Sequence, residues 1–365
     1  MISLQFFPSR TVSFYMARMF LTRTFAVLMA LVVILQFLDM LSESGHIYAH
    51  PGNGQAALFH YVTLRAPEIV ARFLPYSVLL GAIITYSTLN SNSEVIAMKS
   101  AGLSAHQVLA PMIVAAIGVA IVSFAFNDRV VSRATATLDQ WQKVDYGPIP
   151  IDRGDRLNVW TRAGDDLISV GKVSGRADAA KLSGVTIYDR QGGELQAVIT
   201  APNGWREGTA WRVDHAKRFD VTSGQQTDLG SIVIAQGVRP DQFTLATVDA
   251  DGLSFLQLKS AIDDLQASGR PTMSLEGDLW HKVSGPLSAI LMPLLGAVAA
   301  FGIARSGKLF LRAVIGMALG FTYFVIDNFA LAMGNLGAYP PMLAAWAPFF
   351  LFLLIGEAVL IRTEE

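Results

Sequence analysis

Long apolar runs alternate with polar segments along this chain, and they fall into two groups of three. A helix of about 20 apolar residues crosses the hydrocarbon core of a bilayer, which is about 30 Å thick. Six runs reach this length, at residues 20–41, 69–89, 108–126, 283–303, 311–333 and 342–361. The pattern therefore predicts an α-helical membrane protein with six transmembrane helices in a 3+3 arrangement. Residues 1–127 hold the first three helices and residues 281–365 hold the last three.

The insert between the two groups has a different period. Across residues 128–253, apolar and polar positions alternate in short runs such as LISVGKV, GVTIYDR, LQAVIT, AWRVDH and RFDVT. Turn-forming stretches, including AGDD, QGGE, PNGWREG and TSGQQ, separate these runs. Short strands spaced in this way predict an antiparallel sandwich or barrel. The following segment, 254–280, begins with helical spacing and is predicted to return the chain to the membrane as an amphipathic helix.

The basic residues of the short segments indicate the orientation. Cytoplasmic segments of membrane proteins carry an excess of Lys and Arg, and the turn GNLGAYPP between the last two spans has no charge. We therefore expect both termini and residues 91–107 in the cytoplasm, and residues 128–280 on the other side. The first apolar run is too long for the core of a signal peptide, so we expect an uncleaved span. The basic residues are Arg10, Arg18, Arg23, Arg305, Lys308, Arg312 and Arg362.

Composition excludes several function classes. Charged residues make up 16% of the chain, against about 25% in soluble domains. The net charge of −1 gives no electrostatic footprint for nucleic acid. Without cysteine, the chain has neither disulfides nor thiolate metal sites. His46 and His50 have helical metal-ligand spacing, but Gly45 and Pro51 disfavour a helix there, so we expect no metal site.

Motifs for catalysis are weak. GIARSGKLF, at 302–310, has the G-x-x-x-x-G-K spacing of a phosphate-binding loop. That loop needs a preceding strand and a Ser or Thr after its lysine, whereas here a membrane span precedes it and Leu309 follows Lys308. No nucleophile, base and acid occur at interpretable spacing. We therefore expect a non-catalytic chain that binds no cofactor.

Two carboxylates lie within apolar spans, where ionisable groups are costly and are functional candidates by default. Asp39 is near the end of the first span, and Asp327 is flanked by apolar residues in the fifth. The alternatives are an interfacial group for Asp39 and an interhelical hydrogen bond for Asp327.

A short amphipathic helix is predicted between the second and third spans. Ser91 and Glu94 have the spacing of a capping box, Ser93 is a second possible cap, and Gly102 suits a left-handed helix end. Glu94 would face the cytoplasm, and small residues would let another surface approach. Docking to a cytoplasmic partner is the functional interpretation, and a solvated connector is the alternative.

Four motifs carry a resemblance to a known family. SEVIAMKSAGLS at 93–104, DLWHKVSGPLS at 278–288, GMALGFTYFVID at 316–327 and GAYPPMLAAWAP at 337–348 resemble segments of the LptF/LptG permeases. The resemblance covers essentially the whole chain. FLD at 37–39 and the pair Pro340–Pro341 are more similar to the LptG members than to the LptF members.

The resemblance implies a fold and a set of partners. It implies a periplasmic β-jellyroll between the two sets of inner-membrane spans. It also implies a permease subunit of an ABC transporter that extracts lipopolysaccharide and passes it to a periplasmic bridge. The implied partners are an LptF-like permease, a dimeric LptB-like ATPase that holds ATP and Mg²⁺, and LptC-like and LptA-like bridge proteins.

Two sets of residues follow from the resemblance. The coupling helix, about 93–102, would meet the ATPase through Glu94 together with Val95, Met98, Lys99 and Gly102. Faces of spans one and five would line the lipid cavity. The stretch QFLDMLSESG lacks the lysines with which some LptG members meet lipid phosphates, so arginines near the outer face, including Arg72 and Arg129, are substitutes. The cavity candidates are Gln36, Asp39, Arg65, Arg133, Tyr323 and Asp327.

Two other function classes remain open. A mechanotransmission permease would share the coupling helix and drive periplasmic machinery without carrying lipid. A membrane-anchored periplasmic enzyme would use the β domain for catalysis, although six spans are excessive for an anchor.

Overall fold

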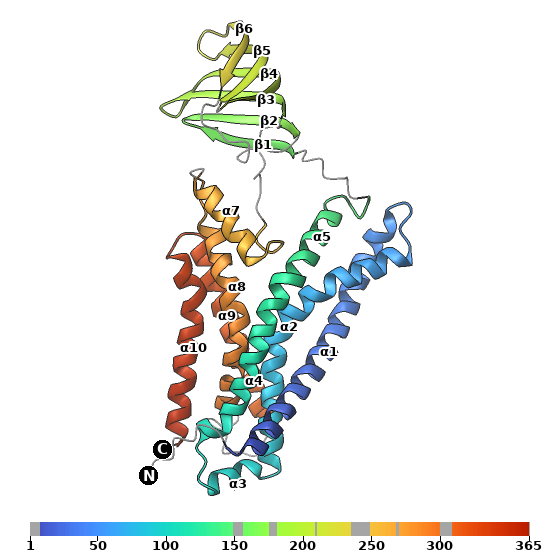
Figure 1. Ribbon diagram of the computed structural model, residues 1–365, viewed down its shortest axis with the longest axis vertical. Helices are drawn as coiled ribbons and strands as arrows, with labels where there is room; N and C mark the ends of the chain where they lie inside the picture. The colour runs from blue at the N-terminus through green and yellow to red at the C-terminus, as the bar shows by residue number, and fades with distance from the viewer. Residues whose placement is uncertain are drawn as a thin grey trace. The chain divides into compact units, whose positions relative to one another are not determined.

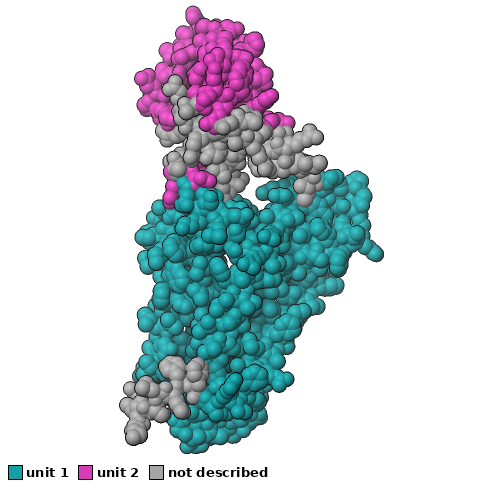
Figure 2. Space-filling view, in the orientation of Figure 1, with its two compact units in different colours: residues 1–149, 249–263, 271–365 teal, residues 150–248, 264–270 magenta. Residues whose placement is uncertain are grey.

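The protein consists of two compact units. A computed structural model describes residues 8–148, 156–174, 181–208, 210–234, 249–267, 270–299 and 309–364. One unit contains the helices and comprises residues 1–149, 249–263 and 271–365 (Figure 2). The other unit, residues 150–248 and 264–270, contains the sheet and the end of one helix, residues 264–267. The sheet unit begins later than the expected boundary at residue 128, because the chain stays helical beyond that point.

Long helices build the first unit (Figure 1). Within the described residues, five helices are long and apolar enough to cross a membrane: 10–49, 55–91, 105–142, 314–335 and 341–362. They correspond to expected spans one, two, three, five and six. The elements are α1 (Arg10–Ala49), α2 (Gln55–Ser91), α3 (Glu94–Ser100), α4 (Ala105–Phe126), α9 (Leu309–Asn335) and α10 (Pro341–Glu364).

The described part of the expected fourth span belongs to a helix that starts earlier than the apolar run. Helix α8 (Met273–Ala297) begins ten residues before the expected start at residue 283, and its first turns carry Glu276 and Asp278. Its second half is almost continuously buried from Ser288 to Ala297. A helix that is apolar on all sides is typical of a buried or membrane-spanning position, and the last residues of the expected span, 300–303, lie outside the described residues. The segment that resembles a phosphate-binding loop lies mostly outside the described residues.

The third span continues beyond its expected end. A π-helical turn, η1 (Asn127–Val131), joins α4 to α5 (Ser132–Gln142). Asp128 in η1 accepts a 2.6 Å hydrogen bond from the backbone N–H of Phe255, the first residue of α7 (Phe255–Ala267). This bond satisfies a free donor at the start of α7. The start of the predicted return helix is thus tied to the end of the third span.

Six strands form one antiparallel sheet in sequential order. Their bounds are β1 (Arg156–Ala163), β2 (Asp166–Ser174), β3 (Lys181–Gln191), β4 (Glu194–Glu207), β5 (Ala210–Asp220) and β6 (Gln226–Ile234). An inserted β domain is therefore confirmed. Among the described strands the order is that of a meander, and they contain no Greek-key crossing of the kind found in a jellyroll.

Two local predictions within the sheet are wrong. AWRVDH and the first three residues of RFDVT belong to one strand, β5, and most of the expected turn PNGWREG belongs to β4. Pairing explains both errors, because Gly204 and Trp205 of the expected turn pair with Val213 and Arg212 of β5. Such tertiary pairing outweighs the local turn preference of Pro, Asn and Gly.

Helices α1 and α2 approach each other closely at Gly81. A methyl group placed there would lie 2.3 Å from Thr24 Oγ1 and 2.9 Å from its Cα. One turn away, the guanidinium of Arg23 donates a 2.7 Å hydrogen bond to the carbonyl of Ile84. These contacts join the two helices at a position where a side chain larger than hydrogen would separate them.

Gly81→Ala should therefore separate α1 from α2 and destabilise the protein. We expect a loss of about 1–3 kcal/mol, as for other overpacked interiors. The measurement is the thermal unfolding midpoint of the full chain in detergent. Gly118→Ala in α4 is the matched control, because a methyl group at Gly118 meets nothing within 4 Å. Equal midpoints for the two variants would contradict the close approach.

Candidate functional site

The short helix α3 begins differently from its prediction. Ser91 is the last residue of α2 and its hydroxyl donates to the carbonyl of Thr88, so the expected capping box with Glu94 is wrong. Ser93 occupies the cap position with a left-handed backbone (φ 58°) but makes no side-chain capping bond. The carboxylate of Glu94 is therefore not used to cap its own helix.

The other end of α3 agrees with its prediction. Gly102 is left-handed (φ +85°), and its N–H donates to the carbonyl of Lys99 at 3.0 Å. The N–H of Leu103 donates to the carbonyl of Met98 at 3.1 Å. This pair of bonds is a Schellman motif, which requires a left-handed residue at the Gly102 position. Helix α4 then begins at once, with Ser104 as its side-chain cap.

Helix α3 packs one face on the helical unit and exposes the other to solvent. Val95 is buried, and Met98 packs against the same apolar cluster. Ile96 is 63% exposed, and Lys99 is also exposed. Val95 and Met98 therefore hold α3 in place, whereas a partner would meet Ile96 and Lys99. Ile96 was missing from the predicted site, although an apolar residue beside a buried one on a short helix is the signal that indicates it.

Glu94 is connected to helix α1. Its Oε1 accepts hydrogen bonds from Asn92 Nδ2 at 3.1 Å and from the hydroxyl of Tyr15 at 3.4 Å. Next to α3, His106 in α4 lies 3.0 Å from the carboxylate of Glu357 in α10. The short helix is thus joined by polar contacts to α1, and the helix that follows it is joined to α10.

A charged network joins α1 and α2 near their other ends. Asp39 Oδ2 accepts a 2.6 Å hydrogen bond from Tyr61, and Asp39 Oδ1 lies 3.3 Å from Arg65. Arg65 also pairs with Glu68, and Glu68 lies 2.7 Å from Arg72. Two carboxylates and two guanidinium groups balance each other. The structure therefore brings two predicted cavity residues together as an ion pair.

The loop after α5 closes over the same ends. The hydroxyl of Tyr146 donates a 2.7 Å hydrogen bond to Glu43, and Asn53 donates to the carbonyls of Ile47 and Tyr146. Burial, followed by the hydrogen bond to Glu43, raises the pKa of Tyr146 to about 12. The phenol therefore remains a donor at physiological pH.

The remaining predicted cavity residues lie in three different settings. Tyr323 and Asp327 in α9 are buried, and Asp327 lies 3.9 Å from His281 of α8. Within the described residues, the buried amide of Gln36 in α1 has no hydrogen-bond partner. Arg133 is exposed on α5. The predicted residues therefore do not form one contiguous polar site within this chain.

Helices α1 and α9 leave much of their apolar surface free. Among the five long apolar helices of the described chain, their most apolar segments have the smallest buried shares, 17% and 28%. Phe25 and Val33 of α1 are 64% and 62% exposed, and Phe321 and Phe329 of α9 are each 64% exposed. Exposed apolar faces of this kind meet lipid or another apolar helix.

The histidines near the end of α1 do not gather. Helix α1 continues to Ala49, so His46 is helical and the expectation of a loop there is wrong. His46 lies 3.4 Å from Glu43, and His60 stacks edge-on against Trp141. Among the described residues, no group of three potential ligands could hold a metal ion.

Arg65→Ala should destabilise the junction of α1 and α2, because it leaves the partly buried Asp39 without a cation and Glu68 with Arg72 alone. We expect a loss of about 1–2 kcal/mol. Arg72→Ala is the matched control. It should cost less than about 1 kcal/mol, because Arg72 is 65% exposed and surface ion pairs contribute little. Both values come from thermal unfolding of the full chain in nanodiscs. A larger loss for Arg72→Ala would contradict the assignment.

Comparison with known proteins places the chain in a family. The lipopolysaccharide export system permease LptF/LptG family model matches residues 14–362. The lipopolysaccharide export system permease protein LptG of Escherichia coli (strain K12) is 26% identical over 348 residues, covering 93% of this chain and 94% of the relative. LptG of Haemophilus influenzae is 24% identical over 369 residues, covering 97% and 99%. The chain belongs to the LptF/LptG family of lipopolysaccharide export system permeases.

Proposed function

We propose that this chain is an LptG-type permease subunit of an ATP-driven lipopolysaccharide exporter in a Gram-negative inner membrane. In this proposal the chain itself does not hydrolyse ATP. A dimeric cytoplasmic ATPase of the LptB type binds ATP and Mg²⁺, and an LptF-like permease pairs with this subunit. LptC-like and LptA-like proteins receive the lipid outside the membrane. Both termini of the chain are cytoplasmic, and its β domain is periplasmic.

The geometry of α3 carries the proposal. This helix lies between two long apolar helices along the chain. Val95 and Met98 pack it against the apolar core of the helical unit, and Ile96 and Lys99 are exposed. A protein that binds the exposed face would move α3 as a rigid body, because the opposite face is packed against the helical unit. The hydrogen bond from the Tyr15 hydroxyl to the Glu94 carboxylate joins α3 to α1, so a displacement of α3 would also act on α1.

The mechanism follows from these connections. ATP-driven closure of the partner dimer displaces α3, and the displacement passes to α1 and α2 through Tyr15 and the close contact at Gly81. The exposed apolar faces of α1 and α9 suit contact with the acyl chains of the lipid and with the second permease. In this mechanism, movement of α1 then narrows the lipid cavity that the faces of α1 and α9 line.

The polar residues divide into two roles in this proposal. Asp39 and Arg65 neutralise each other and hold α1 against α2, so they are structural rather than lipid-binding. Arg133 is exposed, and its guanidinium makes no ion pair within the described part of the chain. It is therefore the better candidate for contact with an anionic headgroup.

The main rival is a permease that transmits movement without carrying lipid. It would use α3 in the same way, so the coupling helix does not separate the two functions. The exposed apolar faces of α1 and α9 do not separate the two functions either, because any membrane subunit presents such faces to the bilayer or to a neighbouring helix. Lipopolysaccharide that crosslinks to neither helix would favour the rival.

Glu94→Arg should disrupt coupling, because it reverses the charge that faces the ATPase and removes the acceptor for Tyr15. We expect the ATPase to co-purify in reduced amount, or ATP hydrolysis to continue with at least about tenfold less lipopolysaccharide release, which corresponds to about 1.4 kcal/mol. Glu194→Arg makes the same charge change on the exposed start of β4 and is the control. Normal co-purification and release in the Glu94 variant would remove the docking role.

A further inference from the structure

The two faces of the β sheet differ sharply in chemistry. One face is packed with buried side chains, among them Val159, Val170, Val185 and Val213. Successive side chains of a strand point to opposite faces, so their sequence neighbours belong to the other face. Four such neighbours lie on the outer face: Trp160 and Thr186, next to Val159 and Val185, and Thr200 and Lys217, next to the buried Ala201 and Ala216. Register aligns three of them, because Thr200 pairs with both Thr186 and Lys217.

A hollow opens on this outer face where the strand pairing is interrupted. Pro202 lies within the central strand β4 and has no N–H to donate. Beside it, Gly184 of β3 is left-handed (φ +67°), and His215 of β5 is left-handed (φ 52°) at a register shift between Val213 and Ala216. Bulges of this kind bend strands and redirect side chains. The interruption of the pairing thus affects β3, β4 and β5 at adjacent register positions.

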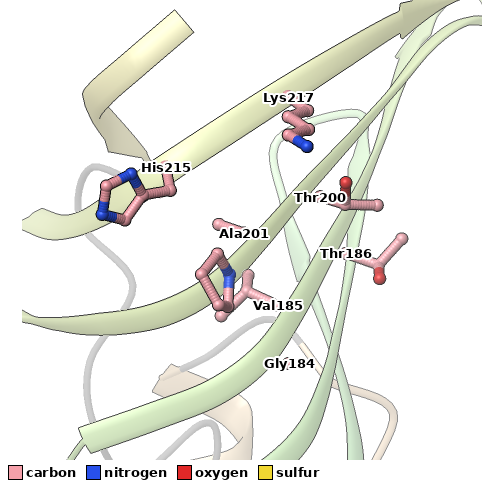
Figure 3. A pocket seen from close by; sticks show the side chains of 8 residues that line it. Gly184, Val185, Thr186, Thr200, Ala201, His215 and Lys217 are labelled. Atoms are coloured by element: carbon pink, nitrogen blue, oxygen red, sulfur yellow. The ribbon is translucent and has the colours of Figure 1, made fainter. Parts of the chain in front are cut away.

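Polar groups from three strands line this hollow. Its lining residues are Gly184, Val185, Thr186, Thr200, Ala201, Pro202, His215 and Lys217. Figure 3 shows Thr186, Thr200 and Lys217 along neighbouring strands, with His215 at the far end. Among the described residues, the Lys217 ammonium makes no ion pair. Asp228 pairs with Lys217 in register, but its carboxylate accepts the N–H of Gly230 at 2.9 Å.

Aromatic rings adjoin the hollow on the same face. Trp160 is 53% exposed and stacks on Tyr188 with ring centroids 5.6 Å apart and an interplanar angle of 13°. Tyr188 lies two residues beyond Thr186, and exposed Phe219 lies two residues beyond Lys217, so both share the outer face. A flat, solvent-exposed indole held in place by a second ring is a preformed platform rather than core packing.

We propose that the outer face of this sheet binds an anionic saccharide, with a phosphate group in the hollow and a sugar ring on Trp160. Lys217 and His215 supply cationic or donor groups for the phosphate, and the hydroxyls of Thr186 and Thr200 supply hydrogen bonds. The indole face receives the C–H groups of the sugar. This inference rests on the proposed function, and it assigns the sugar portion of lipopolysaccharide to the face opposite the apolar core.

The test uses the full chain in nanodiscs and a core oligosaccharide released from lipopolysaccharide by mild acid, with and without its phosphates. Binding is followed by saturation-transfer NMR. Lys217→Ala should weaken binding of the phosphorylated sugar about fivefold and remove the preference for phosphate. Trp160→Ala should weaken both forms by a similar factor.

Lys181→Ala is the matched control. Lys181 is exposed on the same strand as Thr186, about 16 Å away at 3.3 Å per residue, so its removal should leave binding unchanged. The proposal fails if Lys217→Ala binds like the control while circular dichroism shows a folded sheet. It also fails if inorganic phosphate alone competes as well as the oligosaccharide, since the hollow would then be a bare anion site.

Failure of the proposed function has a different signature. A reconstituted wild-type complex that hydrolyses ATP without releasing lipopolysaccharide would overturn the transport role, whatever Lys217→Ala does to oligosaccharide binding. Conversely, normal release together with equal binding by the Lys217 and Lys181 variants would overturn only the saccharide site.

Discussion

The close contact between α1 and α2 at Gly81 and Thr24 is the constraint on which the rest of the helical unit depends. It brings the two helices together where no side chain fits between them, and Arg23 adds a hydrogen bond to the α2 backbone nearby. The ion pair of Asp39 and Arg65 joins the same helices near their other ends. Because α3 follows α2 directly and contacts α1 through Tyr15, the proposed function treats these three helices as one mechanical element.

This arrangement changes how the charged residues of the spans are understood. A charge in an apolar span is a functional candidate when it is considered alone. Asp39 is instead satisfied by Tyr61 and Arg65, and Arg65 is shared with Glu68. A group whose charge is already balanced has little left to offer a lipid phosphate. In the proposed function, contact with an anionic headgroup is therefore assigned to groups that lack internal ion pairs.

The sequence was sufficient for the elements whose signals are strong. Apolar length located five of the long helices, and the left-handed end of α3 followed from Gly102. The sequence was insufficient where tertiary contacts decide the outcome. Helix α8 extends ten residues ahead of the apolar run that predicted the fourth span, through first turns that carry Glu276 and Asp278, and an apolar run does not mark where such an extension begins. Pairing across three strands turned the predicted turn after Pro202 into part of β4.

For the candidate site, the sequence located the short helix α3 but not the direction of each side chain. Val95 and Ile96 are neighbours with similar chemistry, and only packing shows that the first is buried and the second exposed. The outer face of the sheet was missed because its residues come from four strands whose register the sequence does not reveal. Trp160 and Lys217 are 57 positions apart and share a face only through pairing.

The most direct test of the account is a pair of distance measurements in the assembled complex. The chain has no cysteine, so spin labels can be attached at introduced cysteines without background. One pair, Leu41→Cys with Phe59→Cys, spans α1 and α2, and the other, Leu41→Cys with Phe329→Cys, spans α1 and α9. All three side chains are exposed. ATP binding should change the α1–α9 distance and leave the α1–α2 distance unchanged. An α1–α2 distance that changes as much, or an α1–α9 distance that stays constant, would contradict the account.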